Sequence, residues 1–266
     1  MLIEDTEDFS PPLIFECGQA FRFVPVSDTA YKGAAFGKIL TVEKTPGGVL
    51  LDCTDGEFEE IWKNYFDMGL DYAAIRRKVA VNEFMAEAAE FGRGIRILRQ
   101  DFWEALCSFI ISQCNNIPRI RGIIARLCAL CGERLDDGFY AFPSAETVAG
   151  LSVRDLRDIG SGYRAEYILS AARAVAGGGI TAVKLSGMSF DEAKRTLLTI
   201  NGVGNKVADC VLLYGLHMLG AFPVDVWMKR ALEKYFPKDF DHSVFGEYAG
   251  IAQQYIFHYT RYLYAG

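Results

Sequence analysis

The chain carries a lysine at a position where an amine can act as a nucleophile. Lys206 lies in the first turn of a helix that the hydrophobic periodicity predicts from about Asn205 onward. The positive end of the helix dipole disfavours a cation there and favours the neutral amine. A neutral amine can attack an electrophilic carbon and hold it as a Schiff base. The same position also suits an exposed surface lysine, which is the more frequent use when position is the only observation.

An aspartate stands at the start of a second predicted helix. Asp225 follows Pro223-Val224 and directly precedes the helical pattern VWMKRAL. This is the position of a helix N-cap, which contributes about 1 kcal/mol to stability. A carboxylate held by backbone amides stays ionised, so the same residue can stabilise positive charge that develops beside it. Both roles can hold at once.

Two glycines lie in the turn between two amphipathic helical segments. The tetrapeptide Asn201-Gly202-Val203-Gly204 separates a segment that ends at Ile200 from the one that begins near Asn205. Because glycine permits positive φ, this turn can be sharp and can bury Val203 between the helices. The amides of Gly202 and Gly204 can then approach an anion, and a DNA phosphate fits such a helix start. A plain helical hairpin is the commoner use of this pattern, so both interpretations stay open at this point.

Elements of two kinds must position these residues. Strand-forming segments separated by turns such as Thr45-Pro46-Gly47-Gly48 span residues 13–18, 20–26, 37–44 and 48–54. From about Glu57 onward the pattern is helical. Strands followed by helices predict an α+β chain with an antiparallel N-terminal sheet. We predict a β-rich domain with connecting helices over residues 1–92 and an all-helical domain over residues 93–266.

The composition indicates a folded globular protein. The chain has 266 residues, of which 51% are hydrophobic and 23% charged, enough for one large domain or two ordinary ones. The acidic segment MLIEDTEDFSPP lacks the features of a secretory signal, and no apolar run reaches the roughly 18 residues of a membrane span. We therefore expect no membrane partner, and a cytoplasmic location in a bacterium or a nuclear one in a eukaryote.

Cysteine usage limits the metal chemistry. Seven cysteines in a chain without an export signal predict reduced thiols. Cys128 and Cys131 have CxxC spacing, but no second pair completes a zinc site, so we expect them to pack in a helix. No cysteine follows Cys210, which excludes a cluster of four closely spaced thiolates near the carboxyl end, as an iron–sulfur centre requires.

The charge distribution is uneven. A net charge of -6 argues against a nucleic-acid partner, because phosphate binding usually needs a basic surface. The middle of the chain is nevertheless locally cationic, with Arg93, Arg96, Arg99, Arg119, Arg121, Arg126 and Arg134. A solvated helical face would explain these arginines equally well.

Several motifs resemble one family of DNA repair enzymes. INGVGNKVADC followed by FPVDVWMKR is similar to the helix-hairpin-helix and Gly/Pro-Asp signature of the base-excision DNA glycosylases. Within that superfamily, GQAFRF, ISQCNNIPRI, SGYRAEYI and AGIAQQYIF resemble the 8-oxoguanine DNA glycosylases, in the same order along the chain. The resemblance covers both predicted domains. It implies a β-rich N-terminal domain followed by a helix-hairpin-helix glycosylase domain with the active site between its halves.

The resemblance implies roles around a flipped base. Lys206 would attack the sugar carbon, and Asp225 would support the charge that develops on the sugar as the glycosidic bond breaks. Gln253 would read the Watson–Crick edge of the base, while Phe257 and Cys210 would pack on its two faces. Gln253 and Phe257 are spaced i and i+4, which places both on one helical face.

Glycine 18 has a separate implied role. By resemblance, the backbone carbonyl of Gly18 accepts the N7 hydrogen that distinguishes oxidised guanine from guanine. From the residues alone, Gly18 is a strand bulge, and both Phe257 and Cys210 are buried packing residues.

Other matching positions imply contacts with DNA. Tyr163 and Arg164 stand in a glycine-containing turn before a helix, where they would wedge into the duplex and contact the orphaned partner base. Asn116 and Arg119 match the strand-separating region, and the hairpin glycines would bind phosphate. Cys114, however, replaces the asparagine expected to contact the opposite cytosine, which puts stringency for that base in doubt.

A second departure concerns the phosphate contact. Trp227 stands where animal members of the family carry a histidine near the phosphate. This replacement exchanges a group that can be charged for a stacking surface.

These features predict a bifunctional DNA glycosylase and abasic-site lyase. It would flip 8-oxoguanine out of duplex DNA and excise it through a lysine Schiff base, as part of base excision repair. The expected partner is double-stranded DNA containing oxidised guanine, bound by a monomer. We expect no required cofactor, and from resemblance the carbonyls of Leu198, Ile200 and Val203 form a candidate site for Na⁺ or K⁺.

Two alternatives stay open, one from the same superfamily and one from another functional class. An alkylated-base DNA glycosylase would share the fold, but those enzymes lack the lysine nucleophile. A non-enzymatic helix-hairpin-helix DNA-binding module would need neither Lys206 nor Asp225. The combination of these two residues therefore favours the enzyme.

Overall fold

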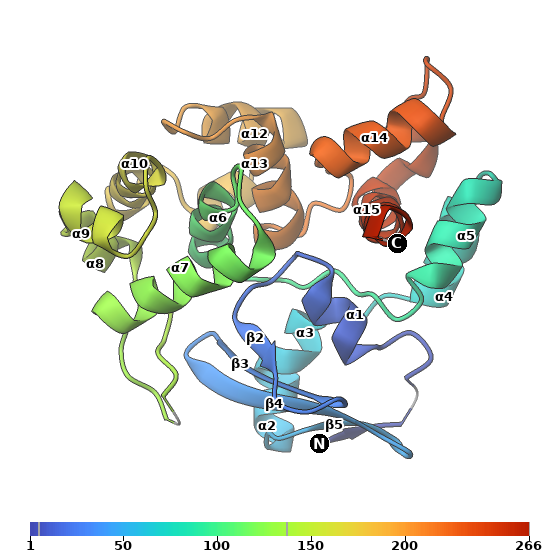
Figure 1. Cartoon of the computed structure of the whole chain (residues 1–266), viewed down its shortest axis with the longest axis horizontal. Coiled ribbons are helices and arrows are strands. Elements are labelled where there is room, and N and C mark those ends of the chain that lie inside the picture. The colour runs from blue at the N-terminus through green and yellow to red at the C-terminus, as the bar shows by residue number, and fades with distance from the viewer. Residues whose placement is uncertain (5, 137, 266) are drawn as a thin grey trace.

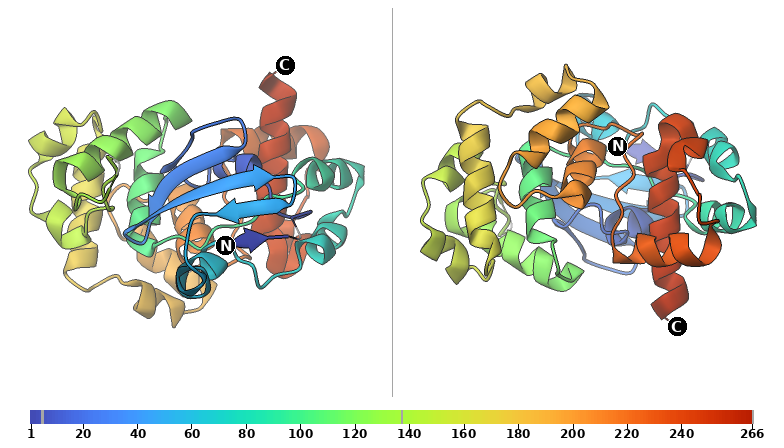
Figure 2. Two further views of the ribbon diagram at one scale, coloured as in Figure 1. Left: turned by 90° about the horizontal axis from the view of Figure 1, so that it is seen from below. Right: turned by 90° about the horizontal axis from the view of Figure 1, so that it is seen from above.

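The computed structural model describes residues 1–4, 6–136 and 138–265 and places a small sheet beneath a larger helical body (Figure 1). The N-terminal part consists of β1 (Leu2–Ile3), α1 (Pro11–Glu16), β2 (Phe23–Pro25), β3 (Ala30–Ala35), β4 (Lys38–Thr45), β5 (Gly48–Leu51), α2 (Asp55–Glu57), the π-helical turn η1 (Phe58–Trp62) and α3 (Lys63–Tyr65). The strands form one antiparallel sheet in the order β1-β5-β4-β3-β2, which the left view of Figure 2 shows from below.

The sheet has its own hydrophobic core. Leu40 and Val42 of β4 and Val49 and Leu51 of β5 are fully buried and pack with aromatic residues that include Trp62. Alternate residues of a strand face the same side, so each strand contributes every second side chain to this core. The sequence analysis correctly predicted β4, β5 and the turn between them.

The segment 13–18 was predicted as a strand, and that prediction is wrong. Its residues belong to helix α1, which has proline at its first positions, Pro11 and Pro12. Proline is favoured there because its φ is already helical and its missing N–H would have had no partner. The apolar residues Ile14 and Phe15, which suggested a strand, are buried against the sheet as one face of the helix.

The rest of the chain is helical. Its elements are α4 (Tyr72–Val79), α5 (Glu83–Phe91), α6 (Phe102–Ile111), α7 (Ile117–Cys131), α8 (Ala145–Ala149), α9 (Val153–Asp158), α10 (Arg164–Ala176), α11 (Ala182–Ser186), α12 (Phe190–Leu198), α13 (Asn205–Cys210), the π-helical turn η2 (Val211–Gly215), α14 (Val226–Tyr235), the 3₁₀ segment η3 (His242–Tyr248) and α15 (Ala249–Ala265). They surround a second, larger core. In the part of the chain that the structure describes, no helix combines the length and apolarity needed to cross a membrane.

An extended segment runs between the two cores (Figure 1). Ile95 and Ile97 join the helical core, whereas Leu98 joins the core of the sheet. This alternation is the two-residue period of an extended chain. Both halves pack against this segment. The antiparallel sheet followed by a helical part confirms the predicted α+β fold class.

A buried carboxylate links the halves at one end of this segment. Asp67, which follows α3, accepts hydrogen bonds from Tyr72 Oη at 2.9 Å and from Arg99 Nη2 at 2.8 Å. Nε2 of His217, which follows η2, lies 2.9 Å from Asp67 Oδ1. Residues from the helical part therefore contact a carboxylate that belongs to the N-terminal part.

Candidate active site

One pocket gathers the residues predicted to act on the base and the sugar. It is lined by Gly18, Lys206, Cys210, Asp225, Gln253 and Phe257, together with Cys17, Phe109, Tyr214, Pro223 and Gln254. These residues come from the loop after α1, from α6, from α13 and η2, from the segment leading to α14, and from α15. Parts of the chain that are far apart in sequence therefore build a single site.

Lys206 lines this pocket from the start of α13. Gly204 is the N-cap of α13, so Lys206 lies in the first turn, as predicted. Its Nζ donates a hydrogen bond to Ser112 Oγ at 3.2 Å and lies 5.0 Å from the centroid of the Phe109 ring. The amine is half-buried.

Cys210 lies one helical turn beyond the lysine. Its thiol is buried, and burial raises the pKa of Cys210 to about 11, outweighing the nearby Lys206 charge, which lowers it. At neutral pH the group is therefore a neutral thiol, which suits packing against an apolar surface.

Asp225 caps α14 as predicted. Its Oδ1 accepts a hydrogen bond from the backbone N–H of Met228 at 2.9 Å. The same side chain lines the pocket that holds Lys206. One carboxylate is thus fixed by the helix start and faces the site.

Two adjacent glutamines of α15 differ in what they can bind. Gln254 donates to the carbonyl of Cys17 at 2.9 Å and accepts from the hydroxyl of Tyr214, so both ends of its amide are used. The Oε1 atom of Gln253 is buried and has no hydrogen-bond partner in the described structure. A buried, unsatisfied acceptor is costly, so this atom is suited to a ligand that donates a hydrogen bond.

Gly18 lies opposite Phe257. Its φ of +82° is in the left-handed region, and a β-carbon at this position would lie 3.4 Å from Cε1 of Phe257. The predicted strand bulge is instead a turn after α1. The glycine allows the chain to turn and its backbone to come close to the pocket.

The hairpin has the geometry that the sequence suggested. Val203 is buried between α12 and α13. Gly202 has a φ of +87°, and a β-carbon there would lie 2.1 Å from Cγ of Tyr167. Its carbonyl accepts a hydrogen bond from Gln113 Nε2 at 3.0 Å, which ties the hairpin to the loop after α6.

The wedge residues have different surroundings. Tyr163 is exposed, at 51%, directly before α10, whereas Arg164 is 2% exposed. The guanidinium of Arg164 donates to the carbonyls of Gln113, Cys114 and Ser161. In this structure Arg164 therefore supports the loop that carries Cys114, and Tyr163 is the side chain that projects.

The loop between α6 and α7 presents three more predicted residues. Cys114 is exposed and has a φ of +47°. Asn116 caps α7 by accepting from the backbone N–H of Arg119 at 3.0 Å, and both side chains are exposed. This loop and Tyr163 lie next to each other, since Tyr163 Oη donates to the Gln113 carbonyl at 3.4 Å.

Trp227 belongs to a cluster of rings and cations on α14. The Arg230 guanidinium lies 4.9 Å from the Trp227 ring, and the Tyr264 ring lies 6.0 Å from it. Lys234 lies 5.5 Å from the Tyr264 ring. In the described residues neither Arg230 nor Lys234 forms an ion pair, so both charges are available at the surface.

The residues that contact Lys206 and Gln254 were not identified from the sequence motifs. Phe109 and Ser112 lie in and directly after α6, whose run of apolar residues indicated only a buried helix. Tyr214 and Cys17 likewise looked like core residues. Ser112 does fall inside the quoted motif ISQCNNIPRI, two residues before Cys114, and a polar residue there was the available signal.

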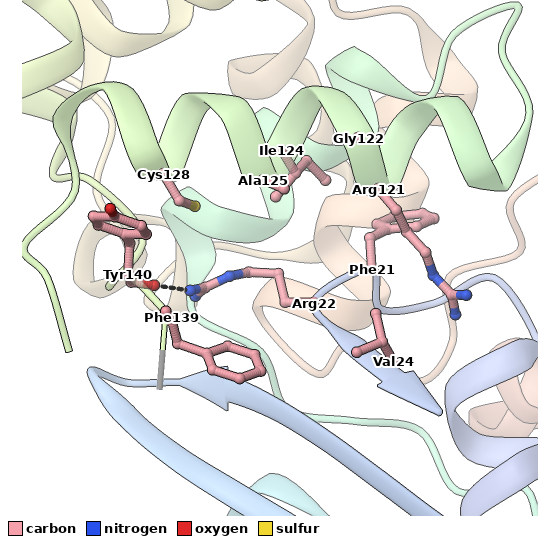
Figure 3. Close-up of a pocket in the computed structure, with 11 residues that line it drawn as sticks. Phe21, Arg22, Val24, Arg121, Gly122, Ile124, Ala125, Cys128, Phe139 and Tyr140 are labelled. Carbon is pink, nitrogen blue, oxygen red and sulfur yellow. Dashed lines mark hydrogen bonds between the residues drawn. The ribbon is translucent and has the colours of Figure 1, made fainter. Parts of the chain in front are cut away.

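A second cavity, drawn in Figure 3, shares no lining residue with this site. It has a volume of about 360 Å³ between β2 and α7 and is lined mainly by apolar side chains. Arg22 crosses it, donating to the carbonyl of Tyr140 and pairing with Glu104 at 3.1 Å. None of the predicted site residues lines this cavity.

Comparison with protein families assigns both halves of the chain. Residues 1–106 match the 8-oxoguanine DNA glycosylase N-terminal domain, and residues 107–243 match the HhH-GPD superfamily of base excision DNA repair proteins. The match of the second family spans the hairpin, Lys206 and Asp225.

Solved structures and a curated relative are similar over different lengths. The chain is 38% identical to MBOgg1, solved with a low-affinity DNA ligand, at a TM-score of 0.93, covering 98% of this chain and 95% of that one. It is 33% identical to the 8-oxoguanine glycosylase/lyase of Clostridium acetobutylicum, solved with DNA containing cytosine opposite 8-oxoguanine, at a TM-score of 0.90 over 97% of this chain and 93% of that one. An N-glycosylase/DNA lyase of Saccharomyces cerevisiae is 36% identical over 64% of this chain, and the match spans about half of the yeast protein, 49%.

Proposed function

Because the chain belongs to the HhH-GPD superfamily of base excision DNA repair proteins and carries the N-terminal domain of the 8-oxoguanine DNA glycosylases, we propose that it excises 8-oxoguanine from duplex DNA and cleaves the resulting abasic strand. One observation carries the proposal. Lys206 and Asp225 line the same pocket as a buried acceptor on Gln253 that has no protein partner.

The base enters this pocket after leaving the duplex. Gln253 Oε1 accepts a hydrogen bond from the Watson–Crick edge, which satisfies the atom that the protein leaves without a partner. The base lies between the Phe257 ring and the Cys210 thiol, which stays neutral because its pKa is raised to about 11. The Gly18 carbonyl accepts the N7–H that oxidised guanine has and guanine lacks.

The lysine then replaces the base. Nζ of Lys206 forms a bond to C1′ of the sugar while the bond from C1′ to N9 breaks, and the base leaves with the electron pair and takes up a proton. The Asp225 carboxylate stabilises the positive charge that develops on the sugar before the new bond is complete. Opening of the sugar ring gives the Schiff base, and loss of a C2′ proton expels the 3′ phosphate.

The DNA-binding residues hold the distorted duplex. Tyr163 projects far enough to occupy the space left by the flipped base, and Arg164 positions the loop that carries Cys114 toward the partner strand. Asn116 and Arg119 belong to the same loop region. The amides at Gly202 and Gly204 bind a phosphate at the start of α13, and Trp227 packs along the backbone nearby.

We also propose that the protein acts as a monomer and that the hairpin binds Na⁺ or K⁺. The pocket is completed by a single chain. The Ile200 carbonyl accepts the Val203 N–H at 3.0 Å and keeps a second lone pair, and carbonyls of this kind, with those of Leu198 and Val203, suit a hard cation. No group of three His, Cys, Asp or Glu side chains in the described residues offers a divalent metal site, and the proposed reaction routes no step through a metal.

Borohydride trapping tests the proposed function. The protein incubated with an 8-oxoguanine duplex and borohydride should form a covalent complex, because reduction makes the Schiff base permanent. Lys206→Gln should bind the same duplex and form no complex. Trapping that persists in Lys206→Gln would show that Lys206 is not the nucleophile. Absence of trapping in the unchanged protein would contradict the proposed lyase activity.

A further inference from the structure

Ser112 places a hydroxyl group beside the amine of Lys206. It is the C-cap residue of α6 and is half-buried. Its Oγ lies 3.2 Å from Nζ of Lys206, and no other hydroxyl in the described residues hydrogen-bonds that nitrogen. The proposed reaction gives this group no direct contact with the substrate.

The direction of this hydrogen bond is fixed by a second one. Ser112 Oγ also lies 2.8 Å from the carbonyl oxygen of Phe109, which can only accept. A hydroxyl has one proton to donate, and Ser112 donates it to the carbonyl oxygen of Phe109. Toward Lys206 the oxygen of Ser112 is therefore an acceptor, so Nζ must donate one of its N–H groups and keeps its lone pair free.

The acceptor is itself held in place. The backbone N–H of Ser112 donates to the Ser108 carbonyl at 2.9 Å, which continues the hydrogen bonding of α6. Phe109 is buried and stacks on Tyr214 with ring centroids 5.2 Å apart. Nζ of Lys206 thus rests between a fixed ring and a fixed oxygen, although a lysine side chain is otherwise flexible.

We propose that Ser112 is a positioning residue that fixes one N–H of Lys206 toward α6 and thereby directs the amine lone pair into the pocket, toward the sugar carbon. The inference rests on the proposed role of Lys206 as nucleophile. Nucleophilic attack requires the lone pair to point at the carbon, so an amine that rotates freely reacts from a smaller fraction of its conformations.

Removal of the acceptor has one expected effect on the chemistry. The rate of Schiff-base formation falls because the amine is no longer oriented. The hydrogen bond does not itself contact the substrate, so duplex affinity should not change.

Single-turnover trapping rates with enzyme in excess of an 8-oxoguanine duplex, together with the affinity for that duplex and the melting temperature, test this proposal. Ser112→Ala should trap about tenfold more slowly, with duplex affinity and melting temperature unchanged. Ser112→Thr keeps the hydroxyl and should restore the rate. Ser108→Ala makes the same chemical change one turn earlier on α6 and should leave the rate unchanged.

The outcomes distinguish the positioning role of Ser112 from the nucleophile role of Lys206. Ser112→Ala that traps at the unchanged rate overturns the positioning role while leaving the nucleophile in place. Slowing of Ser112→Ala that comes with weaker duplex binding or a lower melting temperature also overturns it, because the serine would then only support the fold. Failure of the unchanged protein to trap would overturn the proposed function itself.

Discussion

Asp225 combines an observed structural role with the electrostatic role proposed above. Its Oδ1 caps α14 through Met228, and the side chain also faces the pocket of Lys206. Asp225→Asn keeps an oxygen that can accept the capping hydrogen bond, so the free energy of unfolding should change by less than about 1 kcal/mol. Excision should fall about a hundredfold or more, because the charge is lost. Denaturant unfolding and single-turnover excision measure the two effects, and parallel losses would leave Asp225 as a cap alone.

We propose that Cys114 affects the choice of partner base. It is exposed on the loop that Arg164 supports, and a thiol is a weaker hydrogen-bonding group than an amide. Since one good polar pair is worth about 1 to 3 kcal/mol of discrimination, we expect excision best opposite cytosine but appreciable opposite other bases. Cys114→Asn should tighten the preference, and asparagine tolerates the φ of +47° at this position. Excision rates with each of the four bases opposite 8-oxoguanine measure this preference. Strict dependence on cytosine in the unchanged protein would contradict the prediction.

At the scale of elements, the hairpin depends on one glycine more than the other. Gly202 combines a left-handed φ of +87° with close contact to Tyr167, whereas a β-carbon at Gly204 would meet nothing within 4 Å. Gly202→Ala should therefore lower the free energy of unfolding by about 2 kcal/mol. Gly204→Ala should change it by less than about 0.5 kcal/mol. Chemical denaturation of the two variants gives the comparison, and equal effects would mean that the Tyr167 contact is easily relieved.

The elements also show how far the sequence could predict the fold. Helix periodicity and caps placed the hairpin, α14 and its N-cap Asp225, because those signals are local. The strand β3, with sequence AYKGAA, was missed since alanine, glycine and lysine do not favour strands and its pairing with β2 and β4 decides its conformation. In α1 the apolar run Leu13-Ile14-Phe15 fits a strand or a helix, and the two prolines before it favour the helix.

For the candidate site, the residues could be predicted from the sequence but their contacts could not. The residues of the pocket were identified through family motifs, and the structure brings six of them together. What motifs could not predict were the tertiary partners. That Arg164 turns inward onto backbone carbonyls, and that Ser112 contacts Lys206 across 94 positions of sequence, depends on how α6, α10 and α13 pack.

For the whole molecule, DNA binding must overcome an unfavourable net charge of -6. Binding should come from local cations and amides, so the binding constant should fall steeply with salt. Arg230→Gln removes an unpaired cation beside Trp227 and should reduce the slope of log K against log salt by about 1. Lys44→Gln, an equal charge change on β4, should not alter it. An affinity that is the same at low and physiological salt would contradict phosphate binding.

The link between the two halves predicts a pH dependence of stability. Burial lowers the pKa of His217 to about 4, outweighing the Asp67 carboxylate, which raises it. The unfolded chain, with an ordinary histidine pKa near 6.5, takes up a proton that the folded protein does not. The free energy of unfolding should therefore be greatest above about pH 6.5 and decline as pH falls toward 4.

A substitution isolates this contribution. His217→Asn keeps a residue that accepts the φ of +52° and cannot take up a proton. Its unfolding free energy should decline less between pH 6.5 and 4, with the remainder including His258, whose pKa burial also lowers to about 4. Identical pH profiles for the two proteins would show that His217 does not contribute.

The hydrogen bond from Gln254 to the Cys17 carbonyl joins residues that are 237 positions apart. During synthesis on the ribosome, the loop after α1 emerges early, and α15 is made after every other element of the described chain. A nascent chain can therefore form its hairpin and expose Lys206 before Gln253 and Phe257 exist. If these residues have the roles proposed above, the nascent chain holds its nucleophile before it holds the side chains that read the base, and base recognition begins only when α15 docks.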